Sequence, residues 1–295
     1  MKTGTAYLGL PALALVFNAF TWGVSWWPFR ALQAQGLHPL WATVFIYALA
    51  LAAITVWRPQ AWGQLWQAPS LWWLVAAAGT TNATFNWAVT MGDVVRVVLL
   101  FYLMPLWAVL LARALLGERL SPGAGLRVAL ALAGAAVVLW PAGGGLPVPA
   151  TLAEWLGVLG GFSFALNNVL LRREAHQPAA ARALAMFLGG ALVSGVLAVA
   201  LALGTQASVD WVPALAWPWV LGAVLMGGWF LLGNLALQYG AARLPANVTA
   251  VVMVTEVLFA AVSALALGAG TLTTPLLVGG GLIVGATLLS ARAGH

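Results

Sequence analysis

A single carboxylic acid, Glu256, lies within a long apolar stretch of the chain. Val252-Met253-Val254-Thr255 precede it and Val257-Leu258-Phe259-Ala260 follow it. An ionised carboxylate that faces lipid costs on the order of 2.5–3.5 kcal/mol, so this side chain must face a cavity or a polar partner. Two interpretations stay open: Glu256 contacts a cation or a proton in a functional site, or it forms a structural hydrogen bond with a neighbouring helix.

Amide side chains recur at a spacing of four residues, which places both members of a pair on one face of a helix. Asn82 and Asn86 form one such pair, with Phe85 beside them. The same spacing recurs in Phe164–Asn168 and in Asn234–Gln238. Such amides either contact a ligand or form hydrogen bonds between helices.

Pro105 interrupts the most apolar helix that the sequence predicts, and Tyr102, Met104 and Trp107 flank it. A proline inside a helix removes one backbone hydrogen bond and frees a carbonyl group. We therefore expect a hinge at Pro105, with polar or mobile backbone beside the aromatic side chains. Aromatic packing is the alternative interpretation for each of these neighbours.

The other residue types that support chemistry are absent or badly placed. The chain has no cysteine, and His38, His176 and His295 fall in predicted loops or at the end of the chain. No lysine lies inside a predicted helix, which argues against a fixed phosphate site. No catalytic cluster, metal-ligand set or nucleotide-binding loop is found. The sequence therefore indicates a protein that is not an enzyme and that has no metal and no cofactor.

The composition requires a lipid environment. Hydrophobic residues make up 63% of the 295 residues and charged residues 6%, whereas a soluble domain carries about 25% charged residues. The apolar runs do not alternate with polar residues, so a membrane barrel is not expected. Gly157-x-x-x-Gly161 and Gly281-x-x-x-Gly285 are close-packing motifs of membrane helices. We predict an all-α integral membrane protein.

Ten transmembrane helices are expected, because each charge-free run holds at least one span of roughly 20 residues. Their approximate ranges are 6–28, 38–57, 69–91, 95–115, 123–140, 152–171, 183–203, 215–238, 246–267 and 274–291. The stretch 93–122 resembles the stretch 254–289: aligning Gly117 with Gly268 places Glu256 opposite Pro105. This indicates two inverted five-helix repeats, residues 1–146 and 147–295, around a central cavity within one membrane domain.

Basic residues predict the orientation of the chain in the membrane. With the N-terminus inside, only Arg30 and Arg96 fall on the outer side. The inner side then holds Lys2, Arg58, Arg113, Arg119, Arg127, Arg172, Arg173, Arg182, Arg243 and Arg292. This bias predicts that both termini are cytoplasmic in a multi-pass protein of the bacterial inner (plasma) membrane.

Several motifs resemble those of the drug/metabolite transporter superfamily, in its EamA-like branch. They are Pro105, the turn Gly117-Glu118-Arg119, and Gly268 with Gly279 to Gly285. Phe101-Tyr102-Leu103-Met104-Pro105 and Gly161-Phe162-Ser163-Phe164-Ala165 are similar to cavity segments of YddG-type exporters of aromatic amino acids and methyl viologen. The resemblance implies that a central cavity is lined by Asn82, Phe85, Tyr102, Met104 and Phe164; Asn168 and Glu256 complete the predicted substrate site.

The expected function is an inner-membrane exporter of aromatic or neutral amino acids and aromatic cations such as methyl viologen, working by alternating access. The alternative is a transporter of the same superfamily for another small metabolite, such as a polyamine, a nucleoside or a sugar conjugate. The expected partners are this small-molecule substrate and the lipid bilayer, without nucleic acid, and a monomer is compatible with the sequence. A channel is less favoured, because the polar residues are too sparse for a continuous pore.

Overall fold

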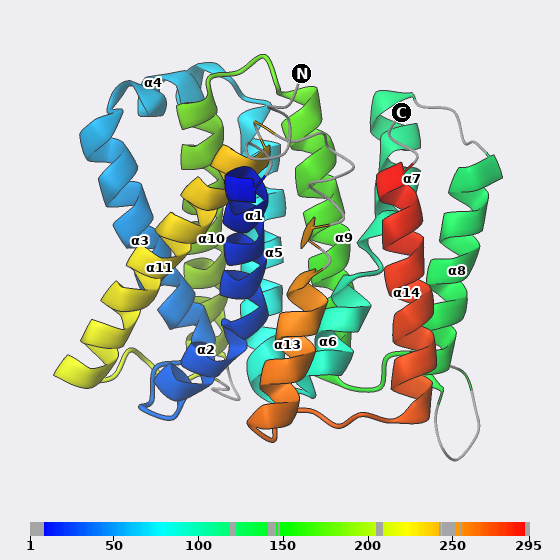
Figure 1. Ribbon diagram of the computed structural model, residues 1–295. Coiled ribbons are helices and arrows are strands. Elements are labelled where there is room, and N and C mark those ends of the chain that lie inside the picture. Colours follow the sequence, from blue (N-terminus) through cyan, green and yellow to red (C-terminus); the bar gives the residue numbers. More distant parts are fainter. Residues whose placement is uncertain are drawn as a thin grey trace.

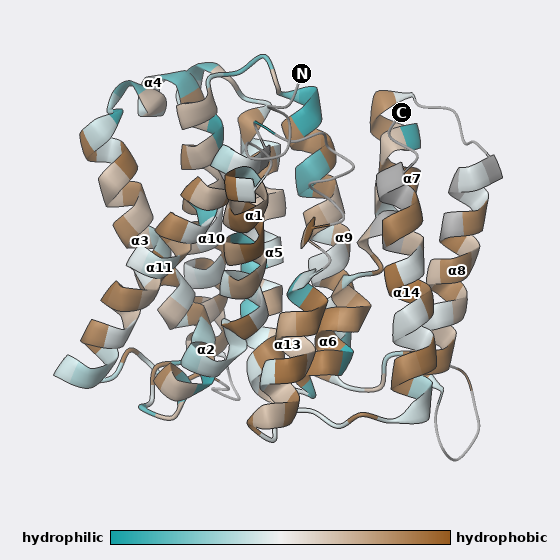
Figure 2. Cartoon of the chain, viewed as in Figure 1, coloured by the Kyte–Doolittle hydropathy of each residue, from teal (hydrophilic) through white to brown (hydrophobic). Residues whose placement is uncertain are grey.

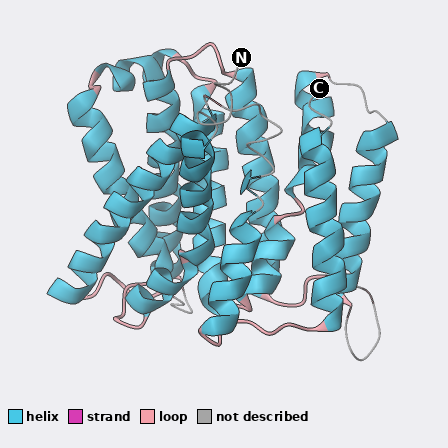
Figure 3. Ribbon diagram, in the orientation of Figure 1, coloured by secondary structure: helices cyan, strands magenta, loops and turns pink. Residues whose placement is uncertain are grey.

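The chain folds into a bundle of α-helices joined by short loops (Figure 1, Figure 3). The structure is a computed structural model that describes residues 9–117, 122–140, 146, 148–204, 209–241, 243, 252–253 and 255–292. Its helices are α1 (Gly9–Val24), α2 (Trp26–Gln33), α3 (Pro39–Trp57), α4 (Gln60–Gln67), α5 (Leu71–Met91), α6 (Val94–Phe101), α7 (Met104–Leu116), α8 (Pro122–Leu139), α9 (Leu152–Arg173), α10 (Ala179–Leu203), α11 (Trp217–Ala241), α13 (Thr255–Ala266) and α14 (Thr274–Arg292).

The prediction of an all-helical protein is confirmed, since no strand occurs among the described residues. Each of the ten predicted ranges contains at least one helix, although the ninth range, 246–267, lies partly outside the described residues. Two details were not predicted: the first range breaks at Ser25, and α4 occupies a predicted loop. The fourth range breaks at Tyr102 and Leu103, just before the proline at which an interruption was expected.

Among the described residues, five helical stretches are long and apolar enough to cross a membrane. They are Gly9–Gln33, Pro39–Trp57, Val94–Leu116, Ala179–Leu203 and Trp217–Leu237. Shorter apolar helices cover Val128–Leu139, Thr255–Ala266 and Thr274–Ala286. Hydrophobic residues run along the helices, and hydrophilic residues gather around their ends, for example at α4 (Figure 2). The number of crossings stays a prediction.

Short polar side chains start several helices. Asp93 precedes α6, and its Oδ1 accepts a hydrogen bond from the backbone N–H of Arg96 at 3.0 Å. Thr151 and Glu154 form a capping box at the start of α9, which satisfies backbone donors that a helix leaves free at its N-terminus. At the other end of α7, Gly117 adopts a φ of +70°, a conformation that glycine reaches without a steric cost.

His38 starts α3 and lies just outside that span. Its Nδ1 accepts a hydrogen bond from the backbone N–H of Leu40 at 3.2 Å, and its ring packs edge-on against Trp87. Burial lowers the pKa of His38 to about 4, and the nearby charge of Asp210 offsets only part of this effect. His38 is therefore a neutral helix cap at pH 7.

Glycines bring several helix backbones into direct contact. The Cα of Gly79 on α5 faces Gly189 on α10, and Gly134 on α8 faces Gly279 on α14. A Cβ atom at Gly134 would lie 2.6 Å from the carbonyl oxygen of Gly279. These pairs belong to the most extensive helix contacts, which join α5 to α10 and α9, and α8 to α14. Close approach of small residues is the usual basis of helix packing in lipid.

The bundle has two ends that carry different features. At the terminal end, which we define by the start of α1 and the end of α14, lies α4 (Figure 1). At the opposite end, which we call the loop end, lie the connection between α5 and α6, the start of α9 and the loop between α13 and α14 (Figure 1). The breaks in the first and fourth predicted helices fall between these ends.

Candidate substrate site at a broken helix

The fourth predicted helix is divided into α6 and α7. Helix α6 ends at Phe101, Tyr102 and Leu103 form a turn, and α7 begins at Met104 with Pro105 in its first turn. A proline is tolerated there because the first helical N–H groups have no partner within the helix. The interruption was predicted, and it lies just before Pro105. The role of Pro105 as a hinge stays a prediction.

The break brings Tyr102 to Glu256, the acid within the ninth predicted span. The hydroxyl of Tyr102 lies 3.1 Å from Oε2 of Glu256 and 3.2 Å from the carbonyl oxygen of Met253. Both side chains are buried, with 2% of Tyr102 and 8% of Glu256 exposed. No cation forms an ion pair with Glu256 within the described part of the chain. The contact joins the first predicted half of the chain to the second.

An aromatic cluster adjoins this contact, and Phe101 is its centre. The ring of Phe101 lies 4.8 Å from that of Phe85, 5.4 Å from that of Phe164 and 6.2 Å from that of Tyr102, measured between centroids. Met104 packs against the same core. Phe101 was not among the predicted site residues, although it belongs to the quoted Phe101-Tyr102-Leu103-Met104-Pro105 motif.

The backbone of α9 packs against the carbonyl group of Phe101, at the centre of the aromatic cluster. A Cβ atom at Gly161 would collide with the carbonyl oxygen of Phe101 and lie 3.1 Å from its carbonyl carbon. Pro105 has no N–H to donate to this oxygen, which is four residues earlier. Gly161 therefore allows α9 to lie directly against the interrupted turn and places Phe164 on Phe101.

The two asparagines of α5 turn toward α3. Asn82 Oδ1 accepts a short hydrogen bond from the hydroxyl of Tyr47, and its Nδ2 donates to the carbonyl oxygen of Ala78 at 2.8 Å. Asn86 Nδ2 donates to Oγ1 of Thr43 at 3.0 Å. In this conformation both amides form the interhelical bonds that the sequence left as one alternative.

Asn168 is the predicted residue with the least protein around it. Its side chain is exposed, and its Oδ1 accepts only a long hydrogen bond, 3.5 Å, from Nδ2 of the buried Asn167. The structure thus brings together Phe85, Tyr102, Phe164 and Glu256 around Phe101, with Met104 packed beside them. Asn82 and Asn168 lie apart from this group, and the ligand-binding role of all seven stays a prediction.

Two hollows occur at the loop end. The larger, of about 610 Å³, is lined by residues that include Arg30, Thr90, Asp93 and Thr271. The smaller, of about 440 Å³, is lined by residues that include Asp93, Arg96 and Glu154. None of the seven predicted site residues lines either hollow. In this conformation the aromatic cluster itself is filled by side chains, so the predicted central cavity stays a prediction.

No group of histidine, cysteine or acidic residues suited to a metal ion is found in the described part of the chain. The group around Phe101 offers a phenol, a carboxyl group and aromatic rings. These groups recognise a ligand by hydrogen bonds, by aromatic contact and by attraction of a cation.

Comparisons with known proteins show a similarity to membrane transporters. Residues 9–140 match the model of the EamA-like transporter family, which confirms the expected resemblance over that stretch. A solved crystal structure shares the fold, with a TM-score of 0.57 and 19% sequence identity over 95% of each chain.

Two relatives come from Pseudomonas aeruginosa. An uncharacterized transporter is 36% identical over 126 residues, which are 41% of this chain and 41% of that protein. The chloramphenicol-sensitive protein RarD is 32% identical over 122 residues, which are 38% of this chain and 40% of that protein. The chain thus spans about two-fifths of the length of the curated relatives it matches.

Proposed function

We propose that this protein is an inner-membrane exporter of aromatic or neutral amino acids and of aromatic cations such as methyl viologen, working by alternating access. The observation that carries the proposal is the contact between Tyr102 and Glu256. It lies at an interrupted helix, beside an aromatic cluster, and between the two predicted halves. Inverted-repeat transporters bind substrate at such interrupted helices between their halves.

A local repeat supports the two inverted units, residues 1–146 and 147–295. Gly23-Val24-Ser25-Trp26 and Gly161-Phe162-Ser163-Phe164 share the pattern of a glycine, a serine two residues later and then an aromatic residue. Both glycines lie against a carbonyl group of the other half. A Cβ at Gly23 would lie 2.8 Å from the carbonyl oxygen of Glu256, as one at Gly161 would collide with that of Phe101.

The packing of the helices follows the same relation between the two proposed halves: the first helix of each half contacts the third and fourth helices of the other half. In the proposed repeat α1 corresponds to α9, α5 to α11, and α13 to the α6–α7 pair. Helix α1 packs on α11 and on α13, and α9 packs on α5 and on α6 and α7. Helices α8 and α14, which correspond to each other, pack together. This agreement supports a duplicated and inverted arrangement, which many alternating-access transporters share.

The chemistry of the site supports the substrate class. Aromatic rings favour flat apolar groups and cations, and the carboxyl group of Glu256 favours an amine or another cation. The EamA-like match to residues 9–140 supports a transporter. The relative RarD is named a chloramphenicol-sensitive protein, and chloramphenicol is an aromatic compound. Chloramphenicol therefore belongs among the candidates to be tested.

A second candidate is transport of another small metabolite, such as a polyamine, a nucleoside or a sugar conjugate. Glu256 is buried and forms no ion pair with a cation of the described residues. This favours substrates that carry an amine, and polyamines meet this requirement without an aromatic ring. The aromatic cluster around Phe101 favours the first proposal.

Uptake into proteoliposomes tests both. Radiolabelled phenylalanine and methyl viologen are offered first, and unlabelled chloramphenicol, putrescine and a nucleoside then compete for the measured flux. We expect saturable flux of an aromatic substrate and its loss in Phe101→Leu, which keeps an apolar side chain but removes the ring. Flux of neither aromatic compound above that of empty vesicles contradicts the first proposal, and saturable flux of radiolabelled putrescine in the same vesicles then favours the second.

Proton coupling through Glu256 is a separate hypothesis. Glu256→Gln keeps the size of the side chain and removes its capacity to gain and lose a proton. We expect the variant to lose the dependence of flux on an imposed pH gradient. An unchanged dependence removes Glu256 from the coupling mechanism and leaves the substrate proposal intact.

A further inference from the structure

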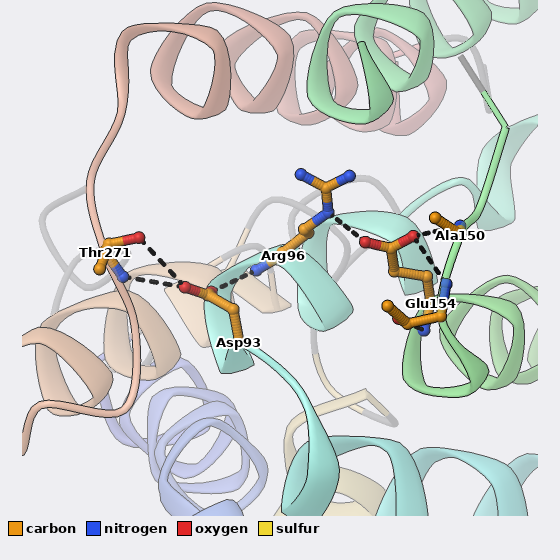
Figure 4. Close-up of polar contacts among 6 residues, drawn as sticks. Asp93, Arg96, Ala150, Glu154 and Thr271 are labelled. Atoms are coloured by element: carbon orange, nitrogen blue, oxygen red, sulfur yellow. Dashed lines mark hydrogen bonds and ion pairs between the residues drawn. The ribbon is translucent and has the colours of Figure 1, made fainter. Parts of the chain in front are cut away.

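Asp93 joins two segments of the chain at the loop end, as Figure 4 shows. Its Oδ1 accepts the backbone N–H of Arg96 at 3.0 Å, and its Oδ2 accepts the backbone N–H of Thr271 at 2.9 Å. The backbone N–H of Val94 donates to the carbonyl oxygen of Ala269 at 3.2 Å. The start of α6 is therefore tied to the loop between α13 and α14, in the other predicted half.

Arg96 ties the same turn to α9. Its Nε lies 2.6 Å from Oε1 of Glu154, with 32% of the Arg96 side chain and 9% of the Glu154 side chain exposed (Figure 4). The other carboxylate oxygen, Oε2, accepts the backbone N–H of Ala150 at 2.7 Å and that of Thr151 at 3.4 Å, and the bond from Thr151 completes the capping box of α9. One carboxylate oxygen of Glu154 thus caps α9, and the other forms the ion pair with Arg96.

Arg30 fastens α2 to the same place. Its Nε donates to the carbonyl oxygen of Val89 at 3.0 Å and its Nη2 to that of Gly92 at 2.6 Å. Arg30 and Arg96 are the two basic residues that the predicted orientation places on the outer side. Arg30 bonds to the carbonyl groups of Val89 and Gly92, and Arg96 pairs with Glu154. These contacts give a structural reason for two arginines on the predicted outer side, where basic residues are otherwise rare.

These bonds close the loop end over the aromatic cluster. The two hollows of about 610 and 440 Å³ share Met91, Gly92 and Asp93 in their walls. Leu100, one helical turn further in than Arg96, is completely buried. Residues 91–93 therefore form a wall that both hollows share, and the buried side chains of α6 follow it along the chain.

We propose that Asp93, Arg96 and Glu154 form a latch that closes the loop end and must open for substrate to pass between the aromatic cluster and that side of the membrane. The inference deepens the proposed transport function and rests on it. The latch is an ion pair and a set of backbone bonds to the other predicted half, so its release lets residues 92–96 separate from α9 and from the α13–α14 loop without breaking the helices.

Cysteine labelling tests the latch without a substrate. The chain has no cysteine, so Leu100→Cys gives a single reporter behind the latch, and Leu272→Cys on the exposed α13–α14 loop establishes from which side the reagent reaches the loop end. The measured quantity is the rate of modification by a membrane-impermeant methanethiosulfonate in proteoliposomes. We expect slow modification at position 100 and a rise of about twofold to fivefold when Arg96→Gln or Glu154→Gln is added.

Glu154→Gln is the sharper variant, because glutamine is also accepted at this position of a capping box and the helix start is retained. The double variant should label no faster than either single variant, since both remove the same ion pair. Arg173→Gln is the matched control: it removes an ion pair of 3.8 Å with Glu174 at the terminal end and should leave the rate unchanged.

Should the substitutions prevent folding, the Leu100→Cys reporter alone decides. Salt screens a pair that is a third exposed, so the labelling rate should rise with ionic strength. A rate that is unchanged by both glutamine variants, or by salt where these do not fold, overturns the latch. Flux that is absent although the latch opens as expected contradicts the transport proposal instead, so the two failures are distinguishable.

Discussion

Removal of one hydroxyl group, in Tyr102→Phe, probes the contact on which the proposed site depends. The hydroxyl lies between Oε2 of Glu256 and the carbonyl oxygen of Met253, at 3.1 and 3.2 Å. Phenylalanine keeps the ring and its packing beside Phe101. The variant therefore removes the polar contact and little else.

The magnitude follows from burial. Removing one partner of a buried hydrogen bond costs about 1–3 kcal/mol, because the other partner stays unsatisfied, whereas interhelical bonds in a membrane protein average about 0.6 kcal/mol and reach about 1.7. With both side chains less than a tenth exposed, we expect Tyr102→Phe to lower the free energy of unfolding by about 1–2 kcal/mol. The coupling energy with Glu256→Gln should be about 1 kcal/mol.

Equilibrium unfolding in mixed detergent micelles measures this double-mutant cycle. Tyr239→Phe is the control, because the ring of Tyr239 lies under the guanidinium of Arg243 and its hydroxyl makes no hydrogen bond within the described residues. Additive effects of Tyr102→Phe and Glu256→Gln would refute the reasoning, as would equal losses in Tyr102→Phe and Tyr239→Phe.

Three further predictions concern the frame around the site. Gly161→Ala should lower the free energy of unfolding by about 1–3 kcal/mol, since its Cβ meets the Phe101 carbonyl; Gly281→Ala, with open space around it, should be neutral or stabilising, and equal effects would contradict the packing. Asn86→Leu alone should cost about 1–2 kcal/mol because the Thr43 hydroxyl loses its donor and keeps only the bond that it donates to the carbonyl oxygen of Pro39, and adding Thr43→Val should restore part of the loss; no restoration would exclude this pairing. Because the folded-state pKa of His38 is about 4 and its ordinary value is 6.5, the unfolded chain binds more protons between these values, so the stability contributed above pH 6.5 should fall by about 1–2 kcal/mol as the pH drops to 4. His38→Asn, which retains a capping acceptor, should remove that part of the pH dependence in the same unfolding assay, and an unchanged pH profile would show that another group is responsible.

The sequence predicted the helices well, because lipid imposes long apolar runs that end at charges and turns. The sequence indicated that Glu256 needs a cavity or a polar partner, and in the structure Glu256 accepts a hydrogen bond from Tyr102. The sequence did not identify Tyr102 as that partner, and the ligand-binding role of both residues stays a prediction. Which partner Glu256 has depends on how α6 and α13 pack, and no local pattern in one sequence gives this.

Packing also explains what could not be predicted. Gly157-x-x-x-Gly161 and Gly281-x-x-x-Gly285 are the same motif, yet Gly157 and Gly161 contact the backbone of α6 whereas Gly281 and Gly285 have open space around them. The break at Ser25 has no proline to signal it; there the hydroxyl of Ser25 donates to the carbonyl oxygen of Trp22 at 2.7 Å. Helix α4 was not predicted, because an eight-residue segment with two tryptophans is equally typical of a loop at the membrane interface.

The polar contacts between α3 and α5 have a consequence for assembly. Thr43 and Tyr47 are one turn apart on α3, and their partners Asn86 and Asn82 are one turn apart on α5 in the reverse order. Two rungs at this spacing define a single alignment of the antiparallel pair, because sliding one helix by a turn would strand an amide among apolar side chains. Contacts between glycines and alanines alone would tolerate such slippage. These four polar side chains therefore fix the register of α3 against α5 when the newly inserted helices pack together.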